Sequence, residues 1–265
     1  MKALRPLLFI VSLLSIVGLA CAGSATPPTQ VPPPTQEVQI PTQPPPEPTE
    51  VPSTEAPATE VATEAPVSQA QQFFTEEFDT PLSGDWSIFT ITDPNASDLE
   101  KVTVEADNGN LVWDLDSEYV YYYLFYNAFE YEDVKVEARA DNRGKNNNSV
   151  SLICRYDEEV GWYEFNIANN GLYDILYAEV LDNGKISYHR IANGGSNAIK
   201  QGKDVNEYSA ACEDEELTLT INGDEVISID ERNYRLRSGL AGVSVSSFNV
   251  LPILIEMDWI RISEP

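Results

Sequence analysis

The chain has 265 residues, 42% of them hydrophobic, and its 43 acidic residues against 16 basic ones give a formal net charge of -27. This balance argues against a nucleic-acid partner, because binding phosphate backbones needs clustered Lys and Arg, and against electrostatic attachment to anionic lipid. All aromatic residues except Phe9 lie from Phe73 onward, and 13 of the 18 prolines lie between Pro27 and Pro66. We therefore expect one domain, residues 73–265, carried on a tether.

The N-terminus has the layout of an export signal. Two basic residues precede an uncharged, mostly apolar stretch at residues 7–20, which is shorter than the roughly 20 residues that a membrane-spanning helix needs. Cys21 follows Gly18-Leu19-Ala20. This ending resembles the lipobox of bacterial lipoproteins, in which a small residue precedes a cysteine that becomes lipidated. Residues 1–20 are thus predicted to be a lipoprotein-type signal peptide, with Cys21 anchoring the protein to the bacterial cell envelope; ordinary secretion is the alternative.

Residues 21–72 have the composition of a disordered tether. From Ala22 to Gln72 the chain contains no Lys, Arg or aromatic residue, and Pro-Thr-Gln recurs three times. Proline removes backbone donors and fixes φ, and few large apolar side chains are present to offset chain entropy. Fully extended as polyproline II, about 50 residues would span on the order of 150 Å. We expect a spacer that carries the domain away from its anchor.

From Phe73 onward, short runs rich in β-forming residues alternate with turn residues, and no long segment has the 3.6-residue period of an amphipathic helix. Three Asn-Gly pairs lie between such runs, at Asn108, Asn183 and Asn222. Asn-Gly supplies the positive φ of tight hairpins. The predicted hairpins pair 102–106 with 111–116, 172–181 with 185–191, and 217–221 with 225–229.

The remaining runs complete an all-β domain. Further predicted strands lie at 86–91, 119–126, 133–140, 150–157, 162–168, 208–213, 239–245 and 253–262. About a dozen short antiparallel strands in one domain predict a two-sheet jelly-roll sandwich.

Several segments in this order resemble a known family. They are Phe73-Phe74-Thr75-Glu76-Glu77-Phe78-Asp79, Trp86, Asn108-Gly109-Asn110-Leu111, Leu152-Ile153-Cys154-Arg155-Tyr156, Trp162-Tyr163-Glu164-Phe165, Gly171-Leu172-Tyr173, Asn206, Cys212, Leu217-Thr218-Leu219-Thr220-Ile221-Asn222-Gly223 and Met257-Asp258-Trp259-Ile260-Arg261-Ile262. Their order and spacing are similar to those of concanavalin A-like lectin/glucanase jelly rolls, in particular the laminin-G-like and 3-keto-disaccharide hydrolase-like domains. The resemblance covers residues 73–265 and implies a curved sandwich whose concave face often binds glycans.

Cys154 and Cys212 form an even pair in an exported, oxidising setting. Because both lie in predicted strands, we expect a disulfide between them; two buried free thiols are the alternative. A zinc site is disfavoured, because such sites need four ligands and the chain has one histidine.

Two acidic runs, residues 157–159 and 213–216, raise the question of calcium. Calcium needs six to eight oxygens from a shaped loop. The chain has no Asp-x-Asp-x-Asp-Gly loop, and Asp is common in tight turns for conformational reasons. The sequence therefore predicts no metal and no cofactor, with a calcium ion as the weaker alternative.

Jelly-roll glucanases carry their catalytic carboxylates on one strand as Glu-x-Asp-x-Glu, because the two-residue period places all three on one face. Glu256-Met257-Asp258 begins this pattern, but Ile260 stands where the last Glu would be. We expect these residues to decorate the last strand, with Met257 and Trp259 facing the core.

A candidate ligand-binding patch follows from the alternation along residues 162–168. Tyr163, Phe165 and Ile167 form an apolar face, so Trp162, Glu164 and Asn166 point to the other side. The predicted binding set joins these three to Arg155, Asp174 and His189 from neighbouring strands. The alternative is a solvated sheet face with one tryptophan. The aromatic face of 119–126, formed by Tyr119, Tyr121, Tyr123 and Phe125, is predicted to be core.

Three functions remain open. The preferred interpretation is a non-catalytic carbohydrate-binding or adhesion module on the cell surface, with a neutral glycan as partner because the negative charge disfavours polyanions. The second is a saccharide-active hydrolase or lyase of the same fold. The third is a structural or protein-interaction module of the cell envelope.

Overall fold

The computed structural model describes residues 70–265. The predicted signal peptide, the lipidation site Cys21 and all but the last three residues of the predicted tether lie outside this range. Within it, the chain forms no helix with the length and apolar character needed to cross a membrane. Apart from a short 3-10 helix, η1 (Leu99–Lys101), its regular structure consists of strands.

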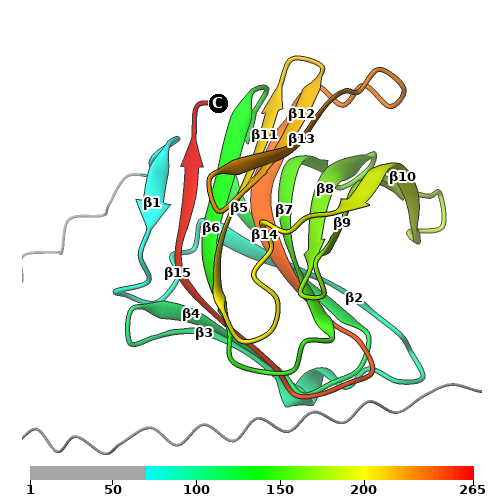
Figure 1. The fold of residues 1–265 in the computed structure, drawn as a ribbon. Helices are drawn as coiled ribbons and strands as arrows, with labels where there is room; N and C mark the ends of the chain where they lie inside the picture. The colour runs from blue at the N-terminus through cyan, green and yellow to red at the C-terminus, as the bar shows by residue number, and fades with distance from the viewer. Residues whose placement is uncertain (1–69) are drawn as a thin grey trace, which may run out of the picture. The chain divides into compact units, whose positions relative to one another are not determined.

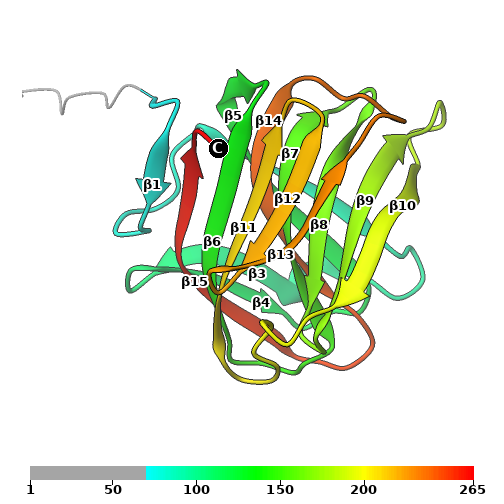
Figure 2. The same ribbon diagram turned by 45° about the horizontal axis from the view of Figure 1, so that its top comes forward.

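Fifteen strands form two antiparallel sheets that lie face to face (Figure 1, Figure 2). In spatial order, the eight-stranded sheet contains β13 (Asp224–Asp230), β12 (Glu216–Ile221), β11 (Val205–Glu213), β6 (Val134–Asn142), β15 (Ile253–Ser263), β4 (Asn110–Leu115) and β3 (Val102–Asp107), with β1 (Phe74–Glu76) paired to the end of β15. The seven-stranded sheet contains β10 (Ile186–Gly195), β9 (Leu172–Val180), β8 (Gly161–Ala168), β7 (Asn148–Asp157), β14 (Gly239–Ser247), β5 (Val120–Tyr131) and β2 (Trp86–Thr92). The predicted two-sheet jelly-roll sandwich is confirmed.

The three predicted hairpins are present as β3–β4, β9–β10 and β12–β13. Asn108 and Gly109 have φ values of 51° and 74°, and Asn222 and Gly223 have 52° and 85°. These left-handed conformations match the right-handed twist of the flanking strands, which is why Asn-Gly predicts the turns well. Every predicted strand is present in the structure. The short strand β1 was not predicted.

The main core lies between the two sheets and is filled from both. Its fully buried members include Leu111, Trp113, Leu152, Phe165, Val243 and Ile262. A disulfide joins Cys154 on β7 to Cys212 on β11, with 6.6 Å between the Cα atoms. The predicted pairing is confirmed, and the bond ties one sheet to the other.

On β15 the prediction for Met257 is confirmed and that for Trp259 is wrong. Met257 is fully buried, but the register with β6 shifts between Met257 and Trp259. A β-bulge adds a residue and so moves the following side chains to the opposite face. Ile260 therefore takes the core position, and Trp259 lies on the outer surface, where the Arg261 guanidinium sits 4.8 Å from its ring centre.

The seven-stranded sheet also buries side chains on its second face, the one that points away from the eight-stranded sheet. A separate cluster there contains Tyr123, Phe125, Ile153, Trp162 and Ala178. We call this surface the concave face, because the sheet bends around it.

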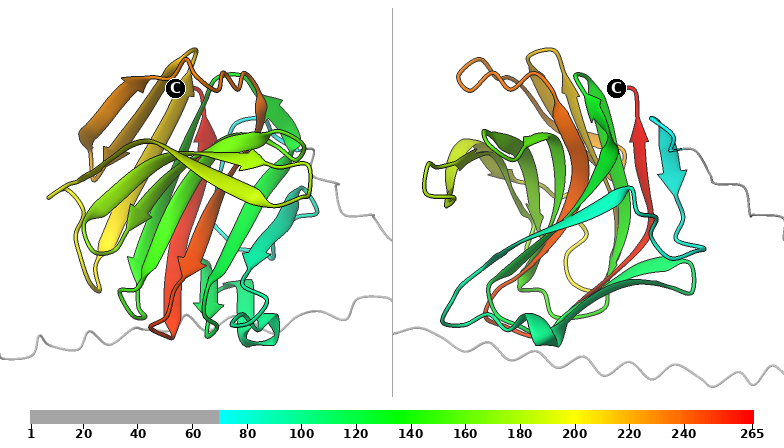
Figure 3. Two further views of the ribbon diagram at one scale, coloured as in Figure 1. Left: turned by 90° about the vertical axis from the view of Figure 1, so that its right-hand side faces the viewer. Right: turned by 180° about the vertical axis from the view of Figure 1, so that it is seen from behind.

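Contacts between distant strands establish the bend. The hydroxyls of Tyr123 on β5 and Tyr188 on β10 are 2.8 Å apart, although five strand spacings separate these strands in the sheet order. In a flat sheet that separation would be about 24 Å, which is farther than two tyrosine side chains reach. The Phe89 ring on β2 likewise lies 6.0 Å from that of Trp162 on β8. The sheet thus curls until its flanks meet above its centre, a bend that can be followed in Figure 3.

Candidate functional site

Four of the six residues predicted to bind a ligand share the concave face. On β8, Tyr163, Phe165 and Ile167 belong to the main core, so Trp162, Glu164 and Asn166 point to the concave side. On β9, Asp174 lies directly opposite Asn166 in the strand register. The alternation thus predicts the placement of these four side chains; their role in binding stays a prediction.

The prediction that Arg155 lies beside Trp162, Glu164 and Asn166 is wrong. Its side chain lies at the end of the sandwich. Its φ is 55°, and the register of β7 with β8 shifts between Cys154 and Asp157. This irregularity turns the guanidinium away from the concave face. It is buried and donates hydrogen bonds to three backbone carbonyls, those of Glu132 (2.8 Å), Asp214 (2.9 Å) and Leu236 (3.0 Å).

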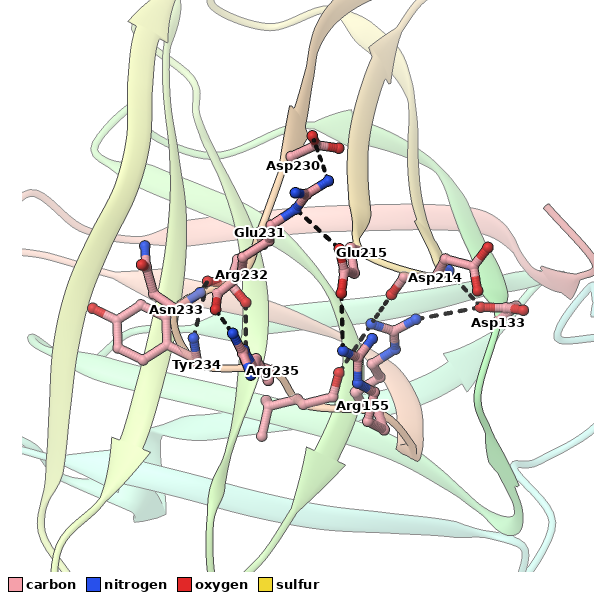
Figure 4. A network of polar contacts seen from close by, with 12 residues as sticks. Asp133, Arg155, Asp214, Glu215, Asp230, Glu231, Arg232, Asn233, Tyr234 and Arg235 are labelled. Atoms are coloured by element: carbon pink, nitrogen blue, oxygen red, sulfur yellow. Dashed lines mark hydrogen bonds and ion pairs between the residues drawn. The ribbon is translucent and has the colours of Figure 1, made fainter.

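Through these hydrogen bonds Arg155 links three loops at the end of the sandwich (Figure 4). It also pairs with Asp133 at 3.3 Å, while burial lowers its pKa. Nearby, the buried Glu231 carboxylate accepts the backbone N–H groups of Asn233, Tyr234 and Arg235. Burial raises the pKa of Glu231, but these bonds and one from the Tyr163 hydroxyl outweigh it and leave the pKa lowered. Both groups hold the loop between β13 and β14 in place.

The expected place of His189 is also wrong. It pairs with Tyr177 across the β9–β10 hairpin, and Tyr177 belongs to the main core. The His189 ring stacks on Tyr177 at 5.9 Å, and its Nε2 lies 2.7 Å from Oε2 of Glu179. The two-residue period of β10 places Tyr188, not His189, on the concave face.

Glu164 is the centre of the concave face. Its side chain accepts hydrogen bonds from Trp162 Nε1 (3.0 Å) and the Tyr123 hydroxyl (3.0 Å) at Oε2, and from the Ser151 hydroxyl (2.8 Å) at Oε1. The residue is 2% exposed. Desolvation raises the pKa of Glu164, and although these hydrogen bonds act in the opposite direction the pKa stays raised.

Aromatic rings surround this carboxyl group. Tyr156 stacks on Phe125 with ring centres 3.9 Å apart, and Tyr123 packs edge-on against Trp162 at 5.5 Å. Burial raises the pKa of Tyr123 well above its ordinary value, and Glu164 and Tyr188 add to the rise. Burial likewise raises the pKa of Tyr188. Both phenols are therefore neutral donors at physiological pH.

The sequence had predicted Tyr121, Tyr123 and Phe125 to be core and did not single out Tyr188 or Ser151. Tyr123 and Phe125 are indeed buried, but against Glu164 and Trp162 rather than between the sheets. The alternation of β5 shows that these side chains share one face. It does not show that the face meets β10, because that contact depends on the bend of the sheet.

Beside Glu164, the floor of the concave face is made of small polar side chains. Ser244 on β14 lies opposite Ser151 on β7, and Ser246 lies opposite Ser149. The Asn166 amide donates to both Ser149 and Ser151. The hydroxyls of Ser244 and Ser246 are buried without a hydrogen-bond partner in the described chain. Unpaired buried hydroxyls are uncommon.

The carboxylates of the incomplete Glu-x-Asp-x-Glu pattern lie elsewhere. Glu256 pairs with Arg143 at 3.1 Å, and Asp258 pairs with Arg139. The buried Met257 between them fixes both on the outer face of the eight-stranded sheet. As predicted, they decorate the last strand.

The two acidic runs that raised the question of calcium are engaged locally. Asp157 accepts the N–H groups of Glu159 (2.8 Å) and Val160 (3.1 Å) in its own turn. Glu215 forms ion pairs with Arg232 and Arg237. Within residues 70–265, no group of three or more His, Cys, Asp or Glu side chains is placed to hold a metal ion.

Comparison with known proteins identifies relatives by fold only. No protein-family model matches the chain, and no curated protein sequence matches it. Solved structures do match, and the three described next are each 13% identical in sequence to this chain. The Bacillus licheniformis β-glucanase aligns with a TM-score of 0.52 over 74% of this chain and 100% of its own. A Bacteroides ovatus mixed-linkage-glucan GH16 protein, solved with its product, aligns with a TM-score of 0.52 over 72% of this chain and 99% of its own. The catalytic domain of an endo-1,3-β-glucanase (laminarinase) from Thermotoga petrophila aligns with a TM-score of 0.50 over 73% of this chain and 98% of its own.

These structures confirm the jelly-roll fold and contradict the preferred prediction of a non-catalytic binding or adhesion module. The three structures named above, each covered over at least 98% of its own length, are described as glucanases or as a mixed-linkage-glucan GH16 protein, which fits the saccharide-active alternative better than the preferred one. The prediction relied on the absence of three carboxylates in series on one strand.

Proposed function

We propose that residues 70–265 form a saccharide-active hydrolase domain in which the Glu164 carboxyl group donates a proton to the leaving oxygen of a glycosidic bond. The observation that carries this proposal is one buried carboxyl group within an aromatic cluster at the centre of a bent sheet. Glycoside hydrolysis requires a carboxylic acid that is protonated when the substrate arrives.

The surroundings of Glu164 favour the protonated state. Desolvation raises the pKa of Glu164, and a carboxyl group whose pKa is raised toward the working pH is the usual general acid in glycosidases. The Tyr123 hydroxyl and the Trp162 indole N–H, each 3.0 Å from Oε2, hold the carboxyl group in one orientation. When the proton leaves, the same donors stabilise the resulting carboxylate.

The surroundings suit a sugar ring. Aromatic faces pack against the apolar side of a pyranose, and hydroxyls and amides bind its hydroxyl groups. The concave face supplies both kinds of group, with Tyr188 at one edge and Asn166 beside the serine floor. We propose a neutral glycan as substrate, and the solved structures with this fold make β-glucans the first to test.

The test is release of reducing ends from mixed-linkage β-glucan and laminarin by the full chain and by Glu164→Gln. Glu164→Gln keeps the shape of the side chain and removes the proton donor, so activity should fall by roughly 10²- to 10⁴-fold. Glu256→Gln is the matched control, because it changes a carboxylate on the outer face of the other sheet. Equal activity of wild type and Glu164→Gln would rule out the proposed role.

We also propose that the domain works outside the cytoplasm, tethered to the envelope through a lipid on Cys21. The basic and apolar leader, the cysteine and the proline-rich segment of the sequence support this. A Cys21→Ser variant should shift from the membrane fraction to the soluble extracytoplasmic fraction. Retention of that variant in the membrane would contradict lipidation as the anchor.

A further inference from the structure

A cavity opens among loops at one end of the sandwich. It is lined by residues 144–147, Asn170, Lys203 and Val250 and has a volume of about 520 Å³, which is in the range of pockets that bind small molecules. We call it the loop cavity, because its residues belong to the connections β6–β7, β8–β9, β10–β11 and β14–β15. Asp133, the ion-pair partner of Arg155, precedes β6, and the loop cavity follows that strand, so the two lie at opposite ends of the sandwich.

The loop cavity is basic, although the chain is strongly acidic. The chain has 43 acidic residues against 16 basic ones, yet the charged residues that line the cavity are Lys145 and Lys203, and none of its described lining residues is acidic. Both lysines are exposed, and neither forms an ion pair within residues 70–265. Two ammonium groups in one cavity without a carboxylate favour a negatively charged ligand.

Asn147 and Asn170 add amide donors to the loop cavity. The side-chain oxygen of Asn147 accepts the backbone N–H of Val250 at 3.1 Å, and that of Asn170 accepts the backbone N–H of Leu172 at 3.1 Å. A backbone N–H bonds to the oxygen of an amide and not to its NH₂ group, so these contacts fix which end of each side chain is engaged. The two NH₂ groups have no partner in the described part of the chain and are available to a ligand.

Buried asparagines hold the loops that carry the two lysines. Asn169 donates to the carbonyl of Gly202 at 3.0 Å and accepts the N–H of the same residue at 3.2 Å, which fixes the backbone next to Lys203. Asn148 donates to the carbonyl of Lys145 at 2.6 Å. Both asparagines are at most 5% exposed. The loops are therefore ordered before a ligand arrives, which reduces the ordering cost of binding.

We propose that the loop cavity binds an anionic sugar unit, a pyranose ring that carries a carboxylate or a phosphate. The ammonium groups of Lys145 and Lys203 pair with the anion through charge-assisted hydrogen bonds, and the amides of Asn147 and Asn170 donate to ring hydroxyl oxygens. Val250, which is 47% exposed, offers an apolar contact to the C–H groups of the ring. The site is separate from the concave face and goes beyond the hydrolase function proposed above.

The size of the cavity favours a sugar over a free inorganic anion. A water molecule takes about 30 Å³ in the liquid, and a phosphate ion has only five heavy atoms. Such an ion fills a small part of a cavity of about 520 Å³. A pyranose ring with its substituents fills more of it and reaches both the lysines and the amides.

The first experiment is isothermal titration of the full-length chain with glucuronate, glucose 6-phosphate and glucose, which share one ring and differ at C6. The better anionic ligand should bind at least ten-fold more tightly than glucose, because losing one charge-assisted hydrogen bond weakens binding by about that factor. Equal binding of glucose, or no binding of any of the three, would overturn the proposal. Inorganic phosphate that binds as tightly as the better anionic sugar would also overturn it, since the ring would then contribute nothing.

Variants test the residues of the loop cavity, with the better anionic sugar as the probe. The double variant Lys145→Gln, Lys203→Gln should weaken binding at least ten-fold, whereas Lys135→Gln, Lys185→Gln removes the same charge outside the cavity and should leave binding unchanged. Asn170→Asp keeps an oxygen to accept its backbone N–H but replaces the donor by a negative oxygen, so it should also weaken binding. All three proteins should unfold at the wild-type temperature. Unchanged binding by the cavity variants, or an equal loss in the control, would overturn the proposed site.

Discussion

Glu164 is buried, and we predict that access to its carboxyl group requires movement of Tyr188, a neighbouring side chain on the edge of the sheet. Glu164 is 2% exposed, while Tyr188 is 39% exposed and lies on the edge strand β10, which pairs only with β9 among the described strands. Its hydroxyl points inward to that of Tyr123 at 2.8 Å. That hydrogen bond and an edge contact with Trp162 are the contacts that hold the Tyr188 side chain in this position.

The expected size of the effect follows from that bond. A typical intramolecular hydrogen bond contributes about 1 kcal/mol net, so Tyr188→Phe should raise the open population about five-fold. Tyr188→Ala removes the cover altogether. Rotation of a partly exposed side chain takes place in picoseconds to nanoseconds, so opening would not limit turnover once the hydrogen bond is broken.

Labelling with a water-soluble carbodiimide and an amine measures this opening without any substrate. Modification of the Glu164 peptide, followed by mass spectrometry, should increase from wild type to Tyr188→Phe to Tyr188→Ala. Glu256 on the outer face is an internal standard, and His189→Ala is the matched control because it alters the same strand on the opposite side. Labelling of Glu164 in Tyr188→Ala at the wild-type rate would show that Tyr188 is not the cover.

Other predictions concern stability, each measured by denaturant unfolding. Replacing both Cys154 and Cys212 by Ala opens a link across 58 residues and should cost about 4 kcal/mol on the chain-entropy estimate; an unchanged midpoint would contradict it. Arg155→Met leaves three buried carbonyls without their charged donor and should cost roughly 3 kcal/mol, so a loss under about 1 kcal/mol would refute the loop-tie role. Because the pKa of Glu164 is raised in the folded state, its stabilising contribution to the free energy of unfolding is fully present below the ordinary pKa of 4.5. That contribution is lost as the pH rises through the folded-state pKa. Wild type should therefore lose stability relative to Glu164→Gln across that interval, and a pH-independent difference would contradict the shift.

Local patterns in the sequence predict the strands and the hairpins because these depend on residues that are close together in the chain. The disulfide follows from the even pair of cysteines, Cys154 and Cys212. Asn222-Gly223 predicts its turn through its own backbone preference. The period of two on β8 separates Tyr163 from Glu164 correctly. These inferences require no knowledge of which strands lie side by side.

The errors arose where a bulge or a long-range contact overrides the period. Bulges at Arg155 and Asp258 shift the alternation by one residue, and no residue type marks these bulges in the sequence. The pairing of β8 with β9 sets Asp174 diagonal to Glu164, and this relation depends on a register that neither strand specifies alone. The period of two therefore placed Glu164 and Asp174 on one face of the sheet without fixing their relative positions.

The distribution of side-chain sizes explains both the bend and the burial of Glu164. On the central strands β7 and β14, the concave side carries Ser149, Ser151, Ser244 and Ser246, together with Gly242. Gly242 has no room for a Cβ, because one would lie 2.3 Å from the carbonyl oxygen of Leu124. The large rings stand on the flanks, on β2, β5, β8 and β10. With a floor of small residues, the flanks can close until the rings bury their apolar surface against one another. The same closure removes water from Glu164 and raises its pKa, so the packing that curves the sheet also favours the protonated carboxyl group on which the proposed function depends.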